Sequence, residues 1–315
     1  MNVIDSRGGR PAVESLDGRV VDTFAEAFPM TAARAIITAD TRDWSRIAAQ
    51  TMTGYATSVI ACDAEAGIER ALDESETPDG RPGFSVLVFA FSRDALEQAL
   101  ANRVGQCVMT CPTTACYSGL PAGEKIVSVG GRLRYFGDGW QVSKRIGGRR
   151  YWRIPVMDGE FLCEETFGTT KGVAGGNLIV MGSESGATLR VTESAVAAIR
   201  GEVRDVILPF PGGIARSGSK VGSKYRGLRA STNTAFTPML RGVVPSEMPR
   251  GVRCVYEIVI DGLTLEAVEK ATAIGVRAAL KEPAVIGVTA GNYGGNLGPH
   301  HIRLLDVLAR FGETA

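Results

Sequence analysis

Apolar residues along this chain form short runs of strand length that alternate with stretches of helical spacing. In the first half, this pattern predicts strands at 34–38, 57–61, 84–90 and 106–110 and helices at 42–52 and 93–103. In the second half, it predicts strands at 177–181, 206–208, 254–260 and 284–289 and helices at 192–199 and 264–281. The chain therefore repeats one order of elements: strand, helix, strand, strand, helix, strand.

This repeated order is that of the split βαβ fold. The sequence therefore predicts the α+β class, with two tandem ferredoxin-like (βαββαβ) lobes and long insertions. We expect an N-terminal extension at 1–14, an N-terminal lobe at 15–161 and a C-terminal lobe at 162–315. Helices would cover one face of each antiparallel sheet and leave the other face for a ligand or partner.

The last helix has the clearest boundary signals. Thr264 follows an Asp-Gly turn and is the expected N-cap, and Glu282-Pro283 is the expected stop.

An insertion at 113–161 joins the two halves and is rich in arginine. Its segments 132–136 and 151–156 predict the two strands of a basic hairpin. A solvated hairpin face explains the charges alone, and a partner-binding surface is the alternative. Its basic residues are Arg145, Arg149, Arg150 and Arg153.

The longest connection in the second half, residues 209–253, is the first candidate for chemistry, because connections of this length in compact domains are usually functional. It opens with a glycine-proline turn made of Phe210, Pro211, Gly212 and Gly213 after Pro209. Adjacent glycines let a backbone approach a ligand. No Asp or Glu occurs from 206 to 246, whereas basic residues stand at 216, 220, 224, 226, 229 and 241. Ser219, Lys220 and Lys224 therefore suit an anionic group, and a mobile surface loop is the alternative.

Glu257 is the candidate acid–base residue. It stands in the strand 254–260 among apolar neighbours on both faces. Burial raises the pKa of a carboxyl group, which enables a glutamate to exchange protons at neutral pH. A structural glutamate paired with an arginine such as Arg253 is an equally supported interpretation.

Composition excludes several classes of protein. The formal net charge of +1 argues against a nucleic-acid binder, and the strands lack the aromatic pattern of an RNA-binding module. No apolar run is long enough to cross a membrane, and residues 1–14 do not resemble a signal peptide, so a cytoplasmic protein is expected. Six cysteines without zinc-site spacing and only two histidines, His300 and His301, predict no metal site.

Several segments closely resemble formylmethanofuran:tetrahydromethanopterin formyltransferase, over about residues 16–297. They are DTFAEAF at 22–28, CDAEAGI at 62–68, TPDGRPG at 77–83, GVAGGN at 172–177, PFPGGI at 209–214, SKVGSK at 219–224 and CVYEIVI at 254–260. Within these segments we also count Asn177 as a candidate substrate-binding residue. The N-terminal extension, the basic hairpin, the Pro299-His300-His301 segment and the lack of strong acidity resemble the bacterial branch of this family.

The resemblance implies two similar α+β lobes, a homo-oligomer (dimer or tetramer) with active sites at a subunit interface, and no prosthetic group. It implies Glu257 as the acid–base residue, with tetrahydromethanopterin and methanofuran or methylofuran as substrates. The bacterial branch implies formyl-hydrolase subunits as partners in the oxidation of formaldehyde to formate. A non-catalytic pterin-binding or scaffold subunit of such a complex is the competing hypothesis.

Overall fold

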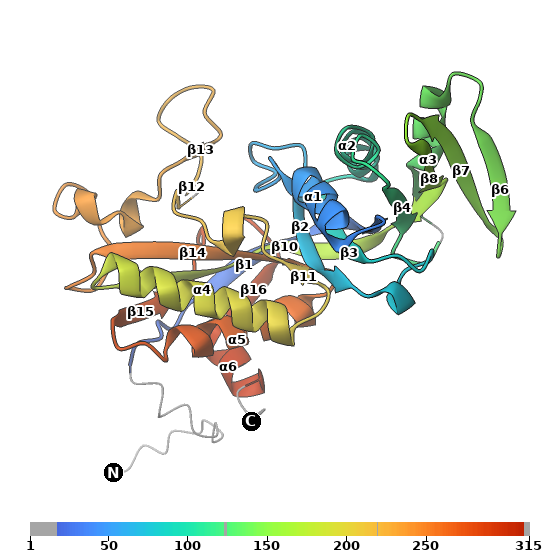
Figure 1. The fold of residues 1–315 in the computed structure, drawn as a ribbon. Coiled ribbons are helices and arrows are strands. Elements are labelled where there is room, and N and C mark those ends of the chain that lie inside the picture. The colour runs from blue at the N-terminus through green and yellow to red at the C-terminus, as the bar shows by residue number, and fades with distance from the viewer. Residues whose placement is uncertain (1–17, 123–124, 219, 312–315) are drawn as a thin grey trace, which may run out of the picture.

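The computed structural model describes residues 18–122, 125–218 and 220–311. It shows a mixed α+β protein with two groups of helices placed side by side along one extended sheet system (Figure 1). The expected N-terminal extension at 1–14 and the candidate Ser219 lie outside the described residues. No helix in the described ranges combines the length and apolar character needed to cross a bilayer.

The elements of the N-terminal half follow the predicted order, with additions after the second helix. In chain order they are β1 (Phe24–Thr38), α1 (Arg42–Thr53), β2 (Glu65–Leu72), β3 (Gly83–Ala90), α2 (Arg93–Arg103), β4 (Ala115–Ser118), β5 (Ile126–Ser128), α3 (Gly130–Leu133), β6 (Val142–Ile146), β7 (Arg149–Val156), β8 (Gly159–Glu164) and β9 (Thr166–Gly168). The predicted boundary between the lobes, 161/162, falls inside β8, which pairs with β4 and β7.

The C-terminal half repeats the order around a much longer connection. Its elements are β10 (Thr170–Gly182), α4 (Ser185–Glu202), β11 (Val206–Ile207), β12 (Lys220–Val221), β13 (Ala230–Ser231), β14 (Cys254–Gly262), α5 (Leu265–Ala279), β15 (Val285–Thr289), β16 (His300–Arg303) and α6 (Leu304–Phe311). The segment between β12 and β13 projects from the body of the protein (Figure 1).

Each half builds an antiparallel sheet with the same relation between chain order and strand order. In the N-terminal half β4, β1, β3 and β2 are neighbours in that order, and in the C-terminal half β15, β10, β14 and β11 are. The two sheets join because β1 also pairs with β10, with Met30 opposite Gly172. The N-terminal end of β1 pairs with β16 of the other half. The two long strands therefore hold both halves together.

Three apolar clusters account for most of the buried interior. One lies between α4, α5, α6 and the sheet of the C-terminal half, and a second lies between α1, α2 and the sheet of the N-terminal half. A third cluster lies where the halves meet and contains residues of both, including Met30, Val59, Phe89, Ala174 and Ile207. Burial of these side chains is the main favourable contribution to stability.

Side-chain caps begin the predicted helices. Thr41 caps α1 by accepting the N–H of Trp44, and Ser92 caps α2 by accepting the N–H of Ala95. The prediction for Thr264 is confirmed, because its side chain accepts the N–H of Ala267 at the start of α5. Helix α5 ends before the Glu282-Pro283 stop.

Three strand predictions are wrong. Residues 57–61 form turns, and the second strand is β2 instead. Val59 is apolar because it packs into the cluster between the halves. Residues 106–110 belong mostly to a π-helical turn, Val104–Val108, in which Val104 and Val108 face the core at helical spacing. Residues 132–136 are helical (α3 and a 3₁₀ turn), so the hairpin forms between β6 and β7.

The glycine-rich segment 172–177 is explained by how closely the strands approach each other. A Cβ at Gly172 would lie 2.7 Å from the Phe89 ring and 3.0 Å from the carbonyl oxygen of Gly262. Gly175 has φ +86° at a bulge of β10, and a Cβ there would lie 2.6 Å from the Phe28 ring. The segment is therefore a requirement of packing between the halves.

We expect Gly172→Ala to lower the free energy of unfolding by about 1–3 kcal/mol, because the added methyl group overpacks a site walled by backbone and a buried ring. Gly201→Ala in α4 is the matched control, since nothing lies within 4 Å of a Cβ there. Alanine in an open helical position should leave stability unchanged or raise it by up to about 1 kcal/mol. Denaturant unfolding of both variants measures the difference, and equal stabilities would contradict this account.

Candidate functional site

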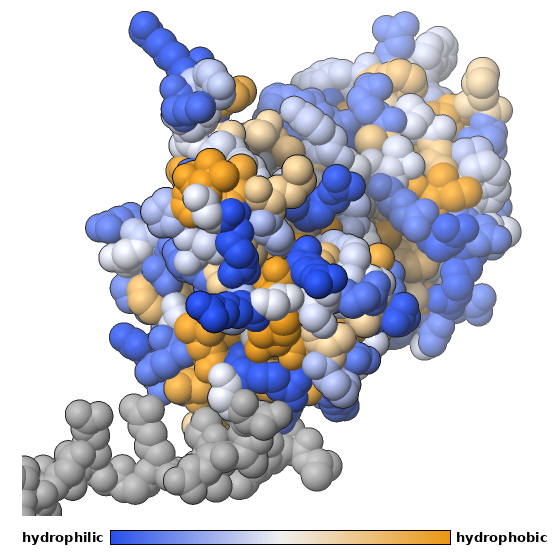
Figure 2. Space-filling model, turned by 90° about the vertical axis from the view of Figure 1, so that its left-hand side faces the viewer, coloured by the Kyte–Doolittle hydropathy of each residue, from blue (hydrophilic) through white to orange (hydrophobic). Residues whose placement is uncertain are grey.

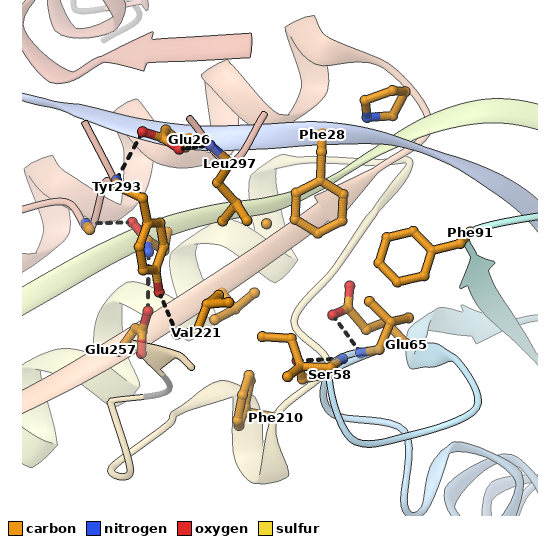
Figure 3. A pocket seen from close by; sticks show the side chains of 17 residues that line it. Glu26, Phe28, Ser58, Glu65, Phe91, Phe210, Val221, Glu257, Tyr293 and Leu297 are labelled. Atoms are coloured by element: carbon orange, nitrogen blue, oxygen red, sulfur yellow. Dashed lines mark hydrogen bonds between the residues drawn. The ribbon is translucent and has the colours of Figure 1, made fainter. Parts of the chain in front are cut away.

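A cavity of about 340 Å³ lies where the two halves meet and is lined by residues of both (Figure 3). The N-terminal half contributes Glu26, Phe28, Pro29, Ser58, Val59, Ile60, Glu65 and Phe91, and the C-terminal half contributes Gly175, Asn177, Phe210, Val221, Glu257, Val259, Gly291, Tyr293 and Leu297. Of the residues predicted from the sequence, Glu257, Asn177 and Phe210 are among them.

Glu257 projects into this cavity from the middle of β14. Its backbone N–H and carbonyl both bond to Ala215, which anchors the chain just after the Gly212-Gly213 turn. On the neighbouring strand Asn177 donates its amide Nδ2–H to Glu257 Oε1 at 3.1 Å. The same amide accepts the N–H of Gly291 through Oδ1 at 2.8 Å, which fixes its orientation. Asn177 therefore links the acid to the loop 290–297.

Burial raises the pKa of Glu257 to about 7, and the hydrogen bond from Asn177 lowers it only in part. The suggested ion pair with Arg253 is not formed, since no ion pair of Glu257 occurs among the described residues. A carboxyl group with this pKa is present in both protonation states at neutral pH, as proton exchange during a reaction requires.

Glu26 holds the loop that closes one side of the cavity. Its carboxylate accepts the backbone N–H groups of Tyr293, Gly295 and Leu297. Burial alone would raise its pKa, but these three donors lower the pKa of Glu26 below its ordinary value. Glu26 is therefore a fixed anion that shapes the loop.

Tyr293 reaches from this loop towards Asn177 and Glu257 (Figure 3). Its hydroxyl accepts the N–H of Val221 at 3.4 Å. Burial, with added effects of the Glu257 and Glu26 charges, raises the pKa of Tyr293, so the hydroxyl stays protonated. Across the cavity the rings of Phe28 and Phe91 stack with centroids 5.9 Å apart, and Phe91 is 65% exposed. They offer a flat apolar surface to a planar ligand.

The remaining predicted residues lie around this cavity. Pro211 and Gly212 line an adjoining groove of about 580 Å³ that shares Phe210 with the cavity. Gly213 packs towards Val196, and its N–H donates to the Phe210 carbonyl. Lys220 is half-buried beside Val221, whereas Lys224 lies exposed over Tyr225 on the projecting segment. Figure 2 shows hydrophilic side chains prevailing on the projection at the top of this face.

Glu26, Tyr293, Phe28 and Phe91 were missed as site residues. They lie far from Glu257 in sequence, and an isolated aromatic or acidic residue in a strand does not indicate which cavity it faces. The glycine-rich segment 290–296 was the only local signal for the loop. Within the described residues, no group of three or more His, Cys, Asp or Glu side chains is placed to hold a metal ion.

The fold and this cavity define an α+β enzyme with a protonatable carboxyl group at the junction of two similar sheets. Residues 15–156 match the family model described as formylmethanofuran-tetrahydromethanopterin formyltransferase, and residues 159–307 match the model described as its proximal lobe. The chain belongs to the formylmethanofuran-tetrahydromethanopterin formyltransferase family, as the sequence segments predicted.

Relatives named for this activity are similar over nearly their whole length. The formyltransferase of Methylococcus capsulatus is 54% identical over 291 residues, which cover 91% of this chain and 97% of the relative. A component of the formyltransferase/hydrolase complex of Methylorubrum extorquens is 51% identical over 301 residues, covering 93% and 96%.

Two solved structures agree with the fold. The formyltransferase/hydrolase complex of Methylorubrum extorquens with methylofuran matches with a TM-score of 0.88 and 50% identity, covering 92% of this chain and 96% of that chain. The formyltransferase of Methanosarcina barkeri matches with a TM-score of 0.87 and 46% identity, covering 94% and 100%. The shared fold is therefore found in bacterial and archaeal relatives.

The raised pKa of Glu257 should make stability depend on pH in one direction. Because the folded pKa of about 7 exceeds the unfolded value near 4.5, the proton's contribution is complete below about pH 4.5 and is lost as pH rises through about 7. Glu257→Gln stays neutral, so its stability relative to the parent chain should rise across this window by up to about 3 kcal/mol and then level off.

Denaturant unfolding at several pH values between 4.5 and 8 measures this difference. Glu202→Gln, at the exposed end of α4, is the control and should show no such trend. A pH-independent difference for Glu257→Gln would place the pKa of Glu257 near its ordinary value.

Proposed function

We propose that the chain transfers a formyl group between N5 of tetrahydromethanopterin and the amine of a methanofuran-type cofactor, with Glu257 as the residue that moves the proton. The observation that carries the mechanism is the position of Glu257 in the cavity, with its pKa raised to about 7 by burial. The similarity to named formyltransferases over nearly the whole chain supports the substrate pair.

The reaction consists of an addition and an elimination. The attacking nitrogen forms a bond to the formyl carbon and gives its proton to the Glu257 carboxylate. The tetrahedral intermediate then breaks its bond to the leaving nitrogen, which takes the proton from Glu257. One carboxyl group thus serves as base and then as acid, and no net proton is gained or lost.

Other cavity residues suit the remaining requirements. The stacked rings of Phe28 and Phe91 offer an apolar face for a pterin or furan ring. Asn177 Nδ2 and the Tyr293 hydroxyl are donors beside Glu257 and would stabilise the oxyanion. The N–H of Gly213 already donates to Phe210, so we favour these two donors over the Gly212-Gly213 turn. The turn, Ser219, Lys220 and Lys224 remain candidates for holding the anionic tails of the substrates.

We further propose that the chain assembles with copies of itself, with the active site near a subunit interface, and with formyl-hydrolase subunits in formaldehyde oxidation. The relative from Methylorubrum extorquens is named as part of such a complex. Large apolar side chains stand exposed outside the cavity, among them Trp140 on the chain leading to β6, Met157 and Met239.

The strand orders β4-β1-β3-β2 and β15-β10-β14-β11 support assigning each half to the ferredoxin-like fold, as two lobes of one chain.

Glu257→Gln should keep the shape of the cavity and lower kcat by about a hundred- to ten-thousand-fold, because it removes the proton-transferring group. Steady-state formyl transfer by the purified full chain, with Glu202→Gln as the matched control, measures this. Turnover near that of the parent chain would remove Glu257 from the mechanism. Absence of transfer by the parent chain itself would favour the scaffold hypothesis.

Lys220→Glu should raise KM by about fivefold at low salt, because it reverses a charge beside the cavity, and the effect should shrink as salt is added. Lys270→Glu on the exposed face of α5 provides the control for the same charge change away from the cavity. Equal KM values for the two variants would place Lys220 outside the binding site.

A further inference from the structure

Two buried carboxyl groups from opposite halves meet beside the cavity. Glu65 begins β2 and is 4% exposed, whereas Asp261 lies near the end of β14 and is fully buried. The two side chains are hydrogen-bonded to each other. Neither carboxyl group belongs to the proton transfer assigned to Glu257.

The hydrogen bonds around this pair leave one oxygen of each group for the other. Glu65 Oε1 accepts the N–H of Val59 at 3.1 Å, and Asp261 Oδ1 accepts the N–H of Gly175 at 3.0 Å. Glu65 Oε2 and Asp261 Oδ2 are both buried and have no other donor among the described residues. Since carboxylate oxygens only accept, a hydrogen bond between the groups needs a proton on one of them.

The surroundings give the charges no compensation. Glu65 pairs across the sheet with Phe89, and Asp261 pairs with Ile207, both of which belong to the apolar cluster between the halves. Within the described ranges no Lys, Arg or His forms an ion pair with either group. Burial raises the pKa of both groups, and the nearby Glu65 charge raises that of Asp261 further. Two ionised carboxylates in contact here would be strongly unfavourable.

The pair is connected to two walls of the cavity. Val59 lies in the segment Ser58–Ile60, which lines the cavity from the N-terminal half, and Gly175 lines it from the C-terminal half. Figure 3 shows Glu65 beside Ser58, opposite the side of the cavity that holds Glu257. Each carboxyl group thus holds the backbone of one wall through one oxygen and the other half through its second oxygen.

We propose that Glu65 and Asp261 share one proton and act as a positioning pair that fixes the Ser58–Ile60 wall against Gly175 in the geometry that binds substrate. Neither residue touches the reacting atoms. The kinetic part of this inference rests on the proposed function, whereas the shared proton is independent of it.

Kinetics of the full chain test the positioning role, with conservative and disruptive variants compared. Glu65→Ala leaves Asp261 buried without its partner and should raise KM about tenfold with kcat changed by less than about twofold. Glu65→Gln supplies an amide N–H in place of the shared proton, so its KM should stay within about threefold of the parent value. Asp261→Asn should behave as Glu65→Gln does.

Glu164→Gln is the matched control, since Glu164 is equally buried but binds Ser118 and Arg149 away from the cavity. It should leave both kinetic constants unchanged. An unchanged KM in Glu65→Ala, or an equal loss in Glu65→Gln and Glu65→Ala, would overturn the positioning role.

Infrared spectroscopy tests the proton without substrate and without an alanine variant that has to fold. In the Glu257→Gln background, we expect a protonated-carboxyl C=O band at neutral pH that disappears on adding Glu65→Gln and Asp261→Asn together. Absence of any band assignable to these residues would overturn the shared proton. If Glu257→Gln retains turnover while this band is present, the proposed mechanism fails and the pair stands.

Discussion

The pairing of β1 with β10 is the interaction on which the architecture depends. These strands belong to different halves, and their contact turns two separate antiparallel sheets into one continuous structure. The approach is close enough that Gly172 and Gly175 have no room for a side chain. Because the cavity lies beside this junction and takes residues from both halves, neither half alone contains the site.

Desolvation at this junction acts on several carboxyl groups, and their hydrogen bonds decide the outcome of each. Glu26 accepts three backbone N–H groups and has a lowered pKa, so it is a fixed anion. Glu257 has one side-chain donor, Asn177, and its pKa rises to about 7. Glu65 and Asp261 contact each other without a cation. One residue type thus gives a structural anion, a proton carrier and a paired acid according to its donors.

The division of roles fits the chemistry of formyl transfer between two nitrogens. Such a reaction needs one group that can accept and return a proton, and it needs rigid walls that bring two large substrates together. The cavity provides Glu257 for the first requirement. Strands and short hydrogen-bonded segments provide the walls, including the loop held by Glu26. A site built in this way obtains its acid–base group from burial alone.

The sequence by itself determined the order of helices and strands, the Thr264 cap, the family and the choice of Glu257, because these depend on local spacing and short motifs. It did not determine the extent of β1 and β10, whose alanine and glycine residues carry little strand signal outside their pairing. It also gave 57–61 and 106–110 as strands, since apolar runs have the same appearance in a turn, a helix or a strand. Only the tertiary structure brought Glu26, Glu65, Phe91 and Tyr293 to the cavity. Those contacts join residues far apart in the chain, and no local pattern encodes which of them become neighbours when two sheets join.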